Sequence, residues 1–197
     1  NARELYREQP YQVGRIIARP FYGKPGEFIR DNANRRDFAL NPPTPNLLTV
    51  LQEKEREVLA VGKIDDIFSH VGISKAVHTK DNMDGVDQTL ALYQNMQNGL
   101  LFTNLVEFDS KYGHRRDVLG YTKALTDFDR RLPEIVAALD EETLLIITAD
   151  HGCDPAYRGT DHTREYVPLL AYSKSMDKGG EIPRQETFAV IGATIAD

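Results

Sequence analysis

Residues 144–152 read Leu-Leu-Ile-Ile-Thr-Ala-Asp-His-Gly, an apolar run that ends in an acid, an imidazole and a glycine. A run with no polar face is typical of a strand buried on both sides of a parallel sheet. Similar runs at 57–64, 100–108 and 167–172 alternate with helical patterns at 84–96, 121–139 and 188–195. This alternation predicts an α/β fold, with a largely parallel sheet flanked by helices.

The first part of the chain has a different composition. Residues 4–9 are typical of the end of a helix, and residues 11–20 predict a strand. Residues 21–45 are rich in Gly, Pro, Asn and Arg, which predicts an ordered loop. Thr44 and Pro45 then match a hydroxyl N-cap followed by proline in the first helical turn. We therefore place a domain boundary between residues 43 and 44.

Composition excludes several classes of protein. With 197 residues, 41% hydrophobic and 27% charged, the chain can form a sizeable core. Its apolar runs are too short to cross a bilayer, and a single cysteine fits a reducing compartment rather than a disulfide scaffold. A net charge of −6 argues against general nucleic-acid binding. The first residue is not methionine and the last lie within a helical pattern, as expected for a piece of a longer protein.

Acidic and imidazole groups follow the predicted strands. Asp109 and His114 come after the run at 100–108, Asp150 and His151 follow the run at 144–149, and His162 lies eleven residues further on. Ligands bind at the carboxyl ends of strands in such sheets. Mixed carboxylate and imidazole donors suit Mn²⁺ or Zn²⁺, and five donors are enough for two ions. Each pair alone is more often a turn or a cap, and the spacing leaves several kinds of metallohydrolase open.

A second group of residues is basic. Arg19, Arg35 and Lys63 lie near Gly23 and Gly26 or at the end of a predicted strand. Guanidinium groups bind phosphate through two parallel hydrogen bonds, so these residues are candidates for holding a phosphorylated substrate. The alternative is a solvated, charged loop, which is the commoner role of such runs.

Several segments resemble a known family. The stretch TADHGCDPAYRGTDHTREYVPLLAYS (148–173) closely resembles phosphopentomutases, a family of the alkaline phosphatase superfamily. So do FDSKYGHRRD, VGKIDDIF, GRIIARPF and TKDNMDG, which spread over nearly the whole chain. The resemblance implies an alkaline-phosphatase-like core and the interconversion of ribose 1-phosphate and ribose 5-phosphate, or of the 2-deoxyribose pair, in nucleoside salvage. It also implies two Mn²⁺ ions, a phosphothreonine intermediate and a sugar bisphosphate primer.

The resemblance also assigns roles to residues. It places Asp109, His114 and His162 on one ion and Asp150 and His151 on the other. Arg19, Arg35 and Lys63 would bind the distal phosphate of a pentose phosphate substrate. Residues 1–43 would be the C-terminal part of a smaller α/β cap domain, and residues 44–197 the C-terminal part of the catalytic core.

The chain departs from the family in one respect. The nucleophilic threonine and a further aspartate ligand belong to segments that precede the cap, and no threonine of this chain can be assigned as the nucleophile. Two alternatives stay open: a metal-dependent phosphatase or phosphoglycerate-mutase-like enzyme of the same superfamily, and a non-catalytic fragment. Neither a nucleic acid nor a membrane is expected as a partner, and the oligomeric state is not predicted.

Overall fold

A parallel three-stranded sheet forms the centre of the molecule, with β5 (Glu57–Val61) as its middle strand. β6 (Lys75–Val77) and β7 (Gly99–Thr103) pair with β5 on either side. The four apolar residues of β5 are no more than 4% exposed. In the computed structural model, which describes residues 13–197, this strand is the most deeply buried part of the chain.

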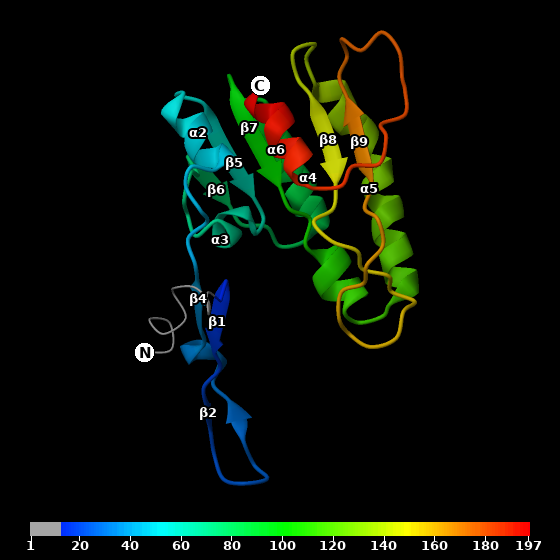
Figure 1. Cartoon of the computed structure of the whole chain (residues 1–197). Coiled ribbons are helices and arrows are strands. Elements are labelled where there is room, and N and C mark those ends of the chain that lie inside the picture. Colours follow the sequence, from blue (N-terminus) through cyan, green and yellow to red (C-terminus); the bar gives the residue numbers. More distant parts are fainter. Residues whose placement is uncertain (1–12) are drawn as a thin grey trace.

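Helices cover both faces of this sheet (Figure 1). On one face Val58 packs with Leu48 of α2 (Leu47–Glu53) and with Ile195 of α6 (Ala189–Ala196). On the other face Leu59 and Val61 pack with Leu92 of α4 (Asn82–Tyr93). Because neighbouring strand residues point to opposite faces, β5 contributes to both clusters. The predicted α/β class, with a parallel sheet flanked by helices, is confirmed.

Two further strands of the core form an antiparallel pair, so residues 167–172 contain a strand as predicted, but not a parallel one. β8 (Leu145–Thr148) pairs with β9 (Leu169–Tyr172), with Leu145 opposite Tyr172. A loop joins the carboxyl end of β8 to the start of β9, and no helix crosses over between them. A parallel pair needs such a crossover, so the chain returns in the opposite direction. α5 (Val118–Ala138) precedes the pair.

Residues 13–39 form two small antiparallel strand pairs. The strand predicted at 11–20 is confirmed for Arg15–Ala18, whereas residues 21–39 contain three short strands where a loop was predicted. β1 (Arg15–Ala18) pairs with β4 (Arg36–Ala39), and β2 (Phe21–Tyr22) pairs with β3 (Ile29–Arg30), followed by the short helix η1 (Asn32–Asn34). Gly23 has φ +118°, and a Cβ there would lie 2.4 Å from the Glu27 carbonyl oxygen. The glycine that suggested a loop therefore turns a hairpin. The helix expected at 4–9 and the first residues of the strand expected at 11–20 lie outside the described residues.

Two helices begin elsewhere than predicted. α2 is capped by Asn46, not Thr44: the Asn46 side chain accepts from the Leu48 and Thr49 amides, and the Thr49 hydroxyl accepts from the Asn46 amide. This reciprocal cap satisfies amides that the helix leaves unpaired. α4 is capped by Asp81, so the predicted cap, Asp84, lies in its first turn. α4 ends at Tyr93, before the predicted residue 96.

Two predicted strands are shorter than expected at their carboxyl ends. β5 ends at Val61, and Lys63 directly precedes the short helix α3 (Ile64–Ile67) without a side-chain capping hydrogen bond. β7 ends at Thr103, and the residues around Asp109 form η2 (Phe108–Gly113), a π-helix. Just before η2, Glu107 is bonded to the first residue of α4: its amide donates to the Asn82 side chain, and its carboxylate accepts from the Asn82 amide. Among residues 13–197 no helix combines the length and apolar character needed to cross a membrane.

Candidate metal centre

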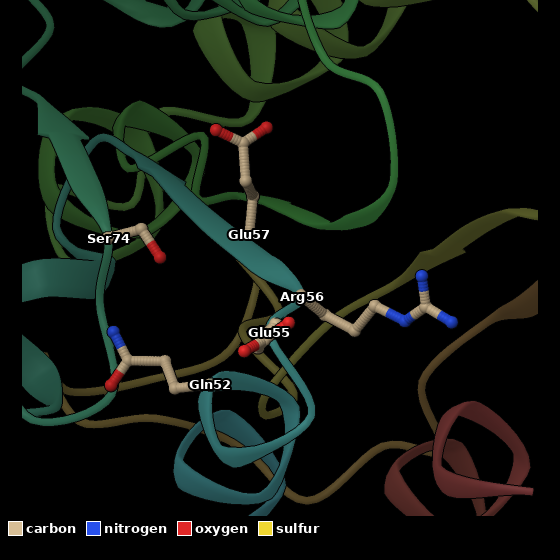
Figure 2. A pocket seen from close by; sticks show the side chains of 5 residues that line it. All are labelled: Gln52, Glu55, Arg56, Glu57 and Ser74. Carbon is tan, nitrogen blue, oxygen red and sulfur yellow. The ribbon is translucent and has the colours of Figure 1, made fainter.

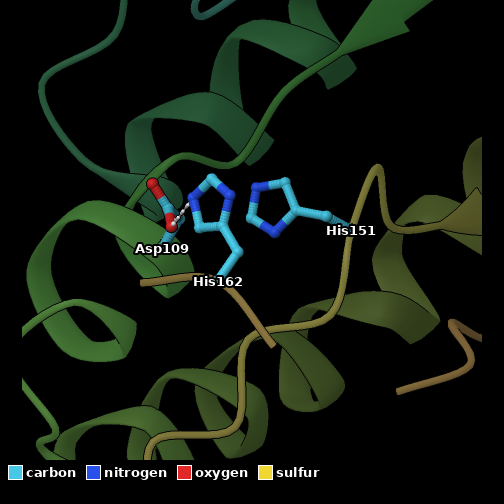
Figure 3. Close-up of side chains that lie close together, drawn as sticks. All are labelled: Asp109, His151 and His162. Carbon is cyan, nitrogen blue, oxygen red and sulfur yellow. Dashed lines mark ion pairs between the residues drawn. The ribbon is translucent and has the colours of Figure 1, made fainter. Parts of the chain in front are cut away.

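Three side chains that follow β7 and β8 meet at one point (Figure 3). Asp109 projects from η2, His151 from the segment after β8, and His162 from the loop before β9. One ligand atom from each of them lies within 4.8 Å of the others, a spacing that suits a shared metal ion. His162 Nε2 is 3.2 Å from Asp109 Oδ1. Residues that are distant in the sequence thus form one group.

His114 belongs to the same neighbourhood. Its Nε2 is 3.3 Å from Asp109 Oδ1, and its ring stacks on His162 with centroids 4.9 Å apart. The rings of His151 and His162 stack with centroids 3.7 Å apart. One carboxylate oxygen therefore faces the Nε2 atoms of two imidazoles, and a third imidazole, that of His151, lies against the ring of His162. Oxygen and imidazole nitrogen donors of this kind suit Mn²⁺ or Zn²⁺.

Two of the imidazoles are oriented by backbone carbonyls. His114 Nδ1 is 2.5 Å from the Thr160 carbonyl oxygen, and His151 Nδ1 is 3.0 Å from the Gly152 carbonyl oxygen. A carbonyl oxygen only accepts hydrogen bonds, so Nδ1 carries the proton in both residues. In the neutral ring this leaves the Nε2 lone pair available. Metal-binding histidines are oriented in this way in many proteins.

A close backbone contact brings His151 beside His162. Gly152 and Thr163 form an isolated antiparallel bridge, in which the Thr163 amide donates to the Gly152 carbonyl at 3.1 Å. A Cβ at residue 152 would lie 2.7 Å from the Thr163 carbonyl oxygen, so the bridge requires glycine there. Both histidines could be identified from the sequence, but this bridge could not, because a contact between two loops has no periodic signal.

Asp150 lies outside the three-residue group. Its Oδ1 is 3.7 Å from His151 Nε2, and its side chain is 73% exposed. The structure therefore brings His151 to Asp109 and His162, whereas the family resemblance paired His151 with Asp150. The assignment of five ligands to two ions stays a prediction.

Cys153 lies next to Asp109, at the side of the three-residue group. Its Sγ is 3.8 Å from Asp109 Oδ1, and a Cβ on Gly113 would lie 2.3 Å from that sulfur. Burial, together with the charge of Asp109, raises the pKa of the Cys153 thiol. A protonated thiol is a weak hydrogen-bond donor and not a metal ligand. Burial is also the main cause of the raised pKa of Tyr121, which lies beside Cys153.

The basic residues do not join this group. Arg19 and Arg30 line an open hollow of about 360 Å³ with Phe21 and Phe28, whose rings meet edge to face at 5.1 Å. In Figure 1 the hairpins that carry Arg19 lie apart from η2 and from the loop after β8. Arg35 is exposed on the same unit, between η1 and β4.

Lys63 is exposed at the carboxyl end of β5, on the edge of the sheet from which η2 also extends. A second hollow of about 360 Å³ lies at the amino end of β5 (Figure 2). Its lining mixes charges and polar groups: Gln52, Glu55, Arg56, Glu57 and Ser74. It contains none of the predicted site residues.

Comparison with known proteins agrees with a metal-dependent function. The sequence pattern of the Metalloenzyme superfamily matches residues 50–197. Proteins named phosphopentomutase are 53% identical over 196 residues in Alkaliphilus metalliredigens, 57% over 186 in Clostridioides difficile and 56% over 196 in Caldanaerobacter subterraneus subsp. tengcongensis. The matches cover 94–100% of this chain and 47–50% of those proteins. The chain thus spans about half the length of the curated relatives it matches.

Proposed function

Because the chain belongs to the Metalloenzyme superfamily, we propose that it forms the metal-binding part of a phosphopentomutase. The enzyme would interconvert ribose 1-phosphate and ribose 5-phosphate, and the 2-deoxyribose pair, in cytoplasmic nucleoside salvage. One observation carries the proposal: Asp109, His151 and His162 converge in a chain 53–57% identical to proteins named phosphopentomutase.

The donor set supports a divalent ion, and we propose two Mn²⁺. Asp109, His114 and His162 would hold the first, and Asp150 and His151 the second. The two sets of ligands are neighbours, which supports two adjacent ions: the His151 ring stacks on His162, and Asp150 Oδ1 is 3.7 Å from His151 Nε2. When bound, such ions supply positive charge that lowers the pKa of a hydroxyl nucleophile and stabilises phosphoryl oxygens.

Groups of this chain would then have two roles, to orient the metal ligands and to bind the substrate. The carbonyls of Thr160 and Gly152 orient the imidazoles of His114 and His151, which would leave their Nε2 lone pairs available to bind an ion. In the proposal, Arg19, Arg35 and Lys63 bind the phosphate that is not being transferred, which positions the pentose for reaction.

The remaining part of the reaction needs a nucleophile and a primer. A sugar bisphosphate would prime the enzyme by phosphorylating a threonine. The proposal assigns this nucleophilic role to no threonine of this chain. Residues 1–43 would belong to a cap domain and residues 44–197 to the core. The separate hairpins of residues 13–39 in Figure 1 support this division.

The proposal is tested by assaying the protein at its natural length with ribose 1-phosphate, Mn²⁺ and a catalytic amount of a sugar bisphosphate. Formation of ribose 5-phosphate that stops on chelation and resumes with Mn²⁺ is the expected result. Steady release of inorganic phosphate without isomerisation would instead indicate a phosphatase. Mn²⁺ binding without any turnover would indicate a non-catalytic chain.

A further inference from the structure

Arg116 reaches from the end of η2 to the loop that carries His162. Its Nε donates to the Gly159 carbonyl at 2.5 Å, and its two terminal nitrogens donate to the carbonyls of Asp154 at 2.7 Å and Asp161 at 2.6 Å. These carbonyls span the segment just before His162. A single side chain therefore fixes the whole of this segment.

These contacts suit a guanidinium group better than any other side chain. Arginine presents several N–H donors in one rigid plane and has no acceptor. Residues 154–161 form no helix and no strand, so their carbonyls need donors from elsewhere. Among the described residues no carboxylate lies within ion-pair distance of Arg116, whose charge is instead surrounded by carbonyl dipoles.

The backbone conformation of Arg116 is also unusual. Its φ of +56° lies in the left-handed region, which residues other than glycine rarely adopt. Arg116 lies in the short connection between η2 and α5, directly before Asp117, the N-cap of α5. Two residues earlier, His114 bonds the Thr160 carbonyl. The loop is thus tied to the end of η2 at two points.

We propose that Arg116 is a positioning residue, which holds the 154–161 loop so that His162 stays beside Asp109 and the ligand atoms are preorganised for an ion. This inference rests on the proposed function, which supplies the premise that an ion binds here. Among residues 13–197, the side-chain hydrogen bonds of Arg116 all go to carbonyls of this loop. Residues that orient ligands in this way typically change metal affinity 10- to 100-fold when removed.

The direction of the effect separates positioning from charge. A cation close to an ion site repels the ion, so a purely electrostatic role predicts that Arg116→Ala strengthens Mn²⁺ binding. A positioning role predicts weaker binding. Alanine retains a Cβ, so the left-handed backbone is similarly unfavourable in both proteins and the comparison reports on the side chain beyond Cβ.

Arg115 provides the matched control. It is adjacent, carries the same charge and is exposed, and among residues 13–197 its side chain makes no hydrogen bond or ion pair. Arg116→Lys provides a second comparison, because it keeps the charge and loses the planar set of donors. All variants are made in the protein at its natural length.

The test combines Mn²⁺ titration calorimetry with hydrogen exchange of the metal-free protein. We expect Arg116→Ala to bind Mn²⁺ about 10-fold or more weakly and to exchange faster at residues 154–163 but not in β5. Arg115→Ala should match the unsubstituted protein, and Arg116→Lys should recover only part of the affinity.

Three results would overturn the inference: unchanged Mn²⁺ affinity in Arg116→Ala, unchanged exchange in the loop, or full recovery by lysine. Failure of the proposed function would look different, because the unsubstituted protein and Arg115→Ala would then both fail to bind Mn²⁺.

Discussion

The imidazole ring of His151 lies 3.7 Å from that of His162, with the two planes inclined by only 17°. The Gly152–Thr163 bridge holds the two segments together next to these rings. Asp109 approaches the edge of the His162 ring from η2, a different part of the chain. A carboxylate and two stacked imidazoles, held by three separate segments, thus form the centre of the proposed metal site.

Replacing His162 with alanine should weaken Mn²⁺ binding and mutase activity together. His162 offers its Nε2 next to Asp109, so the loss should exceed the roughly 10- to 100-fold typical of residues that only orient ligands. Mn²⁺ affinity by calorimetry and the rate of isomerisation measure the two effects. His78→Ala, at an exposed histidine outside the cluster, is the control. Normal Mn²⁺ affinity in the His162 variant would remove this residue from the ligand set.

Gly113→Ala should destabilise the fold near the cluster. The new methyl group would lie 2.3 Å from Cys153 Sγ and 2.9 Å from the Phe108 carbonyl oxygen. Overpacking of this kind costs about 1–3 kcal/mol of unfolding free energy. Urea denaturation measures the loss, and Cys153→Ala in the same protein should restore part of it. Additive losses in the double variant would show that the two residues do not interact.

The Cys153 thiol should ionise at higher pH in the folded protein than in the unfolded chain, because burial raises its pKa. The folded state then holds a proton that the unfolded state releases. Stability from this group is therefore complete below the ordinary thiol range of about pH 8–9 and falls as the pH rises through it. Alkylation by iodoacetamide as a function of pH, with and without urea, measures both states. An alkylation midpoint in the folded protein at or below that of the unfolded chain would contradict the prediction.

Asn46→Ala should cost about 1 kcal/mol of unfolding free energy, as expected for loss of a helix cap. The Asn46 side chain accepts hydrogen bonds from two amides of α2. Thr44→Ala is the matched control, since Thr44 is exposed and precedes the cap. Equal losses in the two variants, measured by thermal or urea denaturation, would place the cap at Thr44 instead.

If Arg19 binds the distal phosphate of the substrate, Arg19→Ala should raise KM for ribose 5-phosphate by about 10-fold or more, as expected for loss of a hydrogen bond to a charged group. The effect on kcat should be smaller, because the residue would hold the phosphate that is not transferred. Lys24→Ala, on the same hairpin unit and exposed, controls for loss of positive charge. An unchanged KM in the Arg19 variant would exclude this role.

The strands and helices that depend on the hydrophobic pattern could be predicted from the sequence. The run at 144–149 and the helical spacing at 121–139 correspond to β8 and α5 because apolar periodicity specifies which faces are buried. Asp109 and the histidines could be named because polar groups that follow apolar strands stand out. The segments that bring them together could not be predicted in the same way.

Those segments depend on contacts between distant residues. The π-helix η2 begins where Glu107 exchanges hydrogen bonds with Asn82, 25 residues away. The loop before His162 is held by Arg116, which in the sequence is only one arginine in a basic run. The strands within residues 21–45 could not be predicted, because pairings of only two residues, such as Phe21 with Arg30, are too short to produce a periodic signal.

Anomalous diffraction at the manganese absorption edge, from crystals of the protein at its natural length grown with Mn²⁺, would test the proposed metal site directly. We expect a peak within bonding distance of Asp109 and of His162 Nε2, with His151 next to it. The absence of a peak there, with manganese bound at other residues or nowhere, would contradict the assignment of these residues to a metal site.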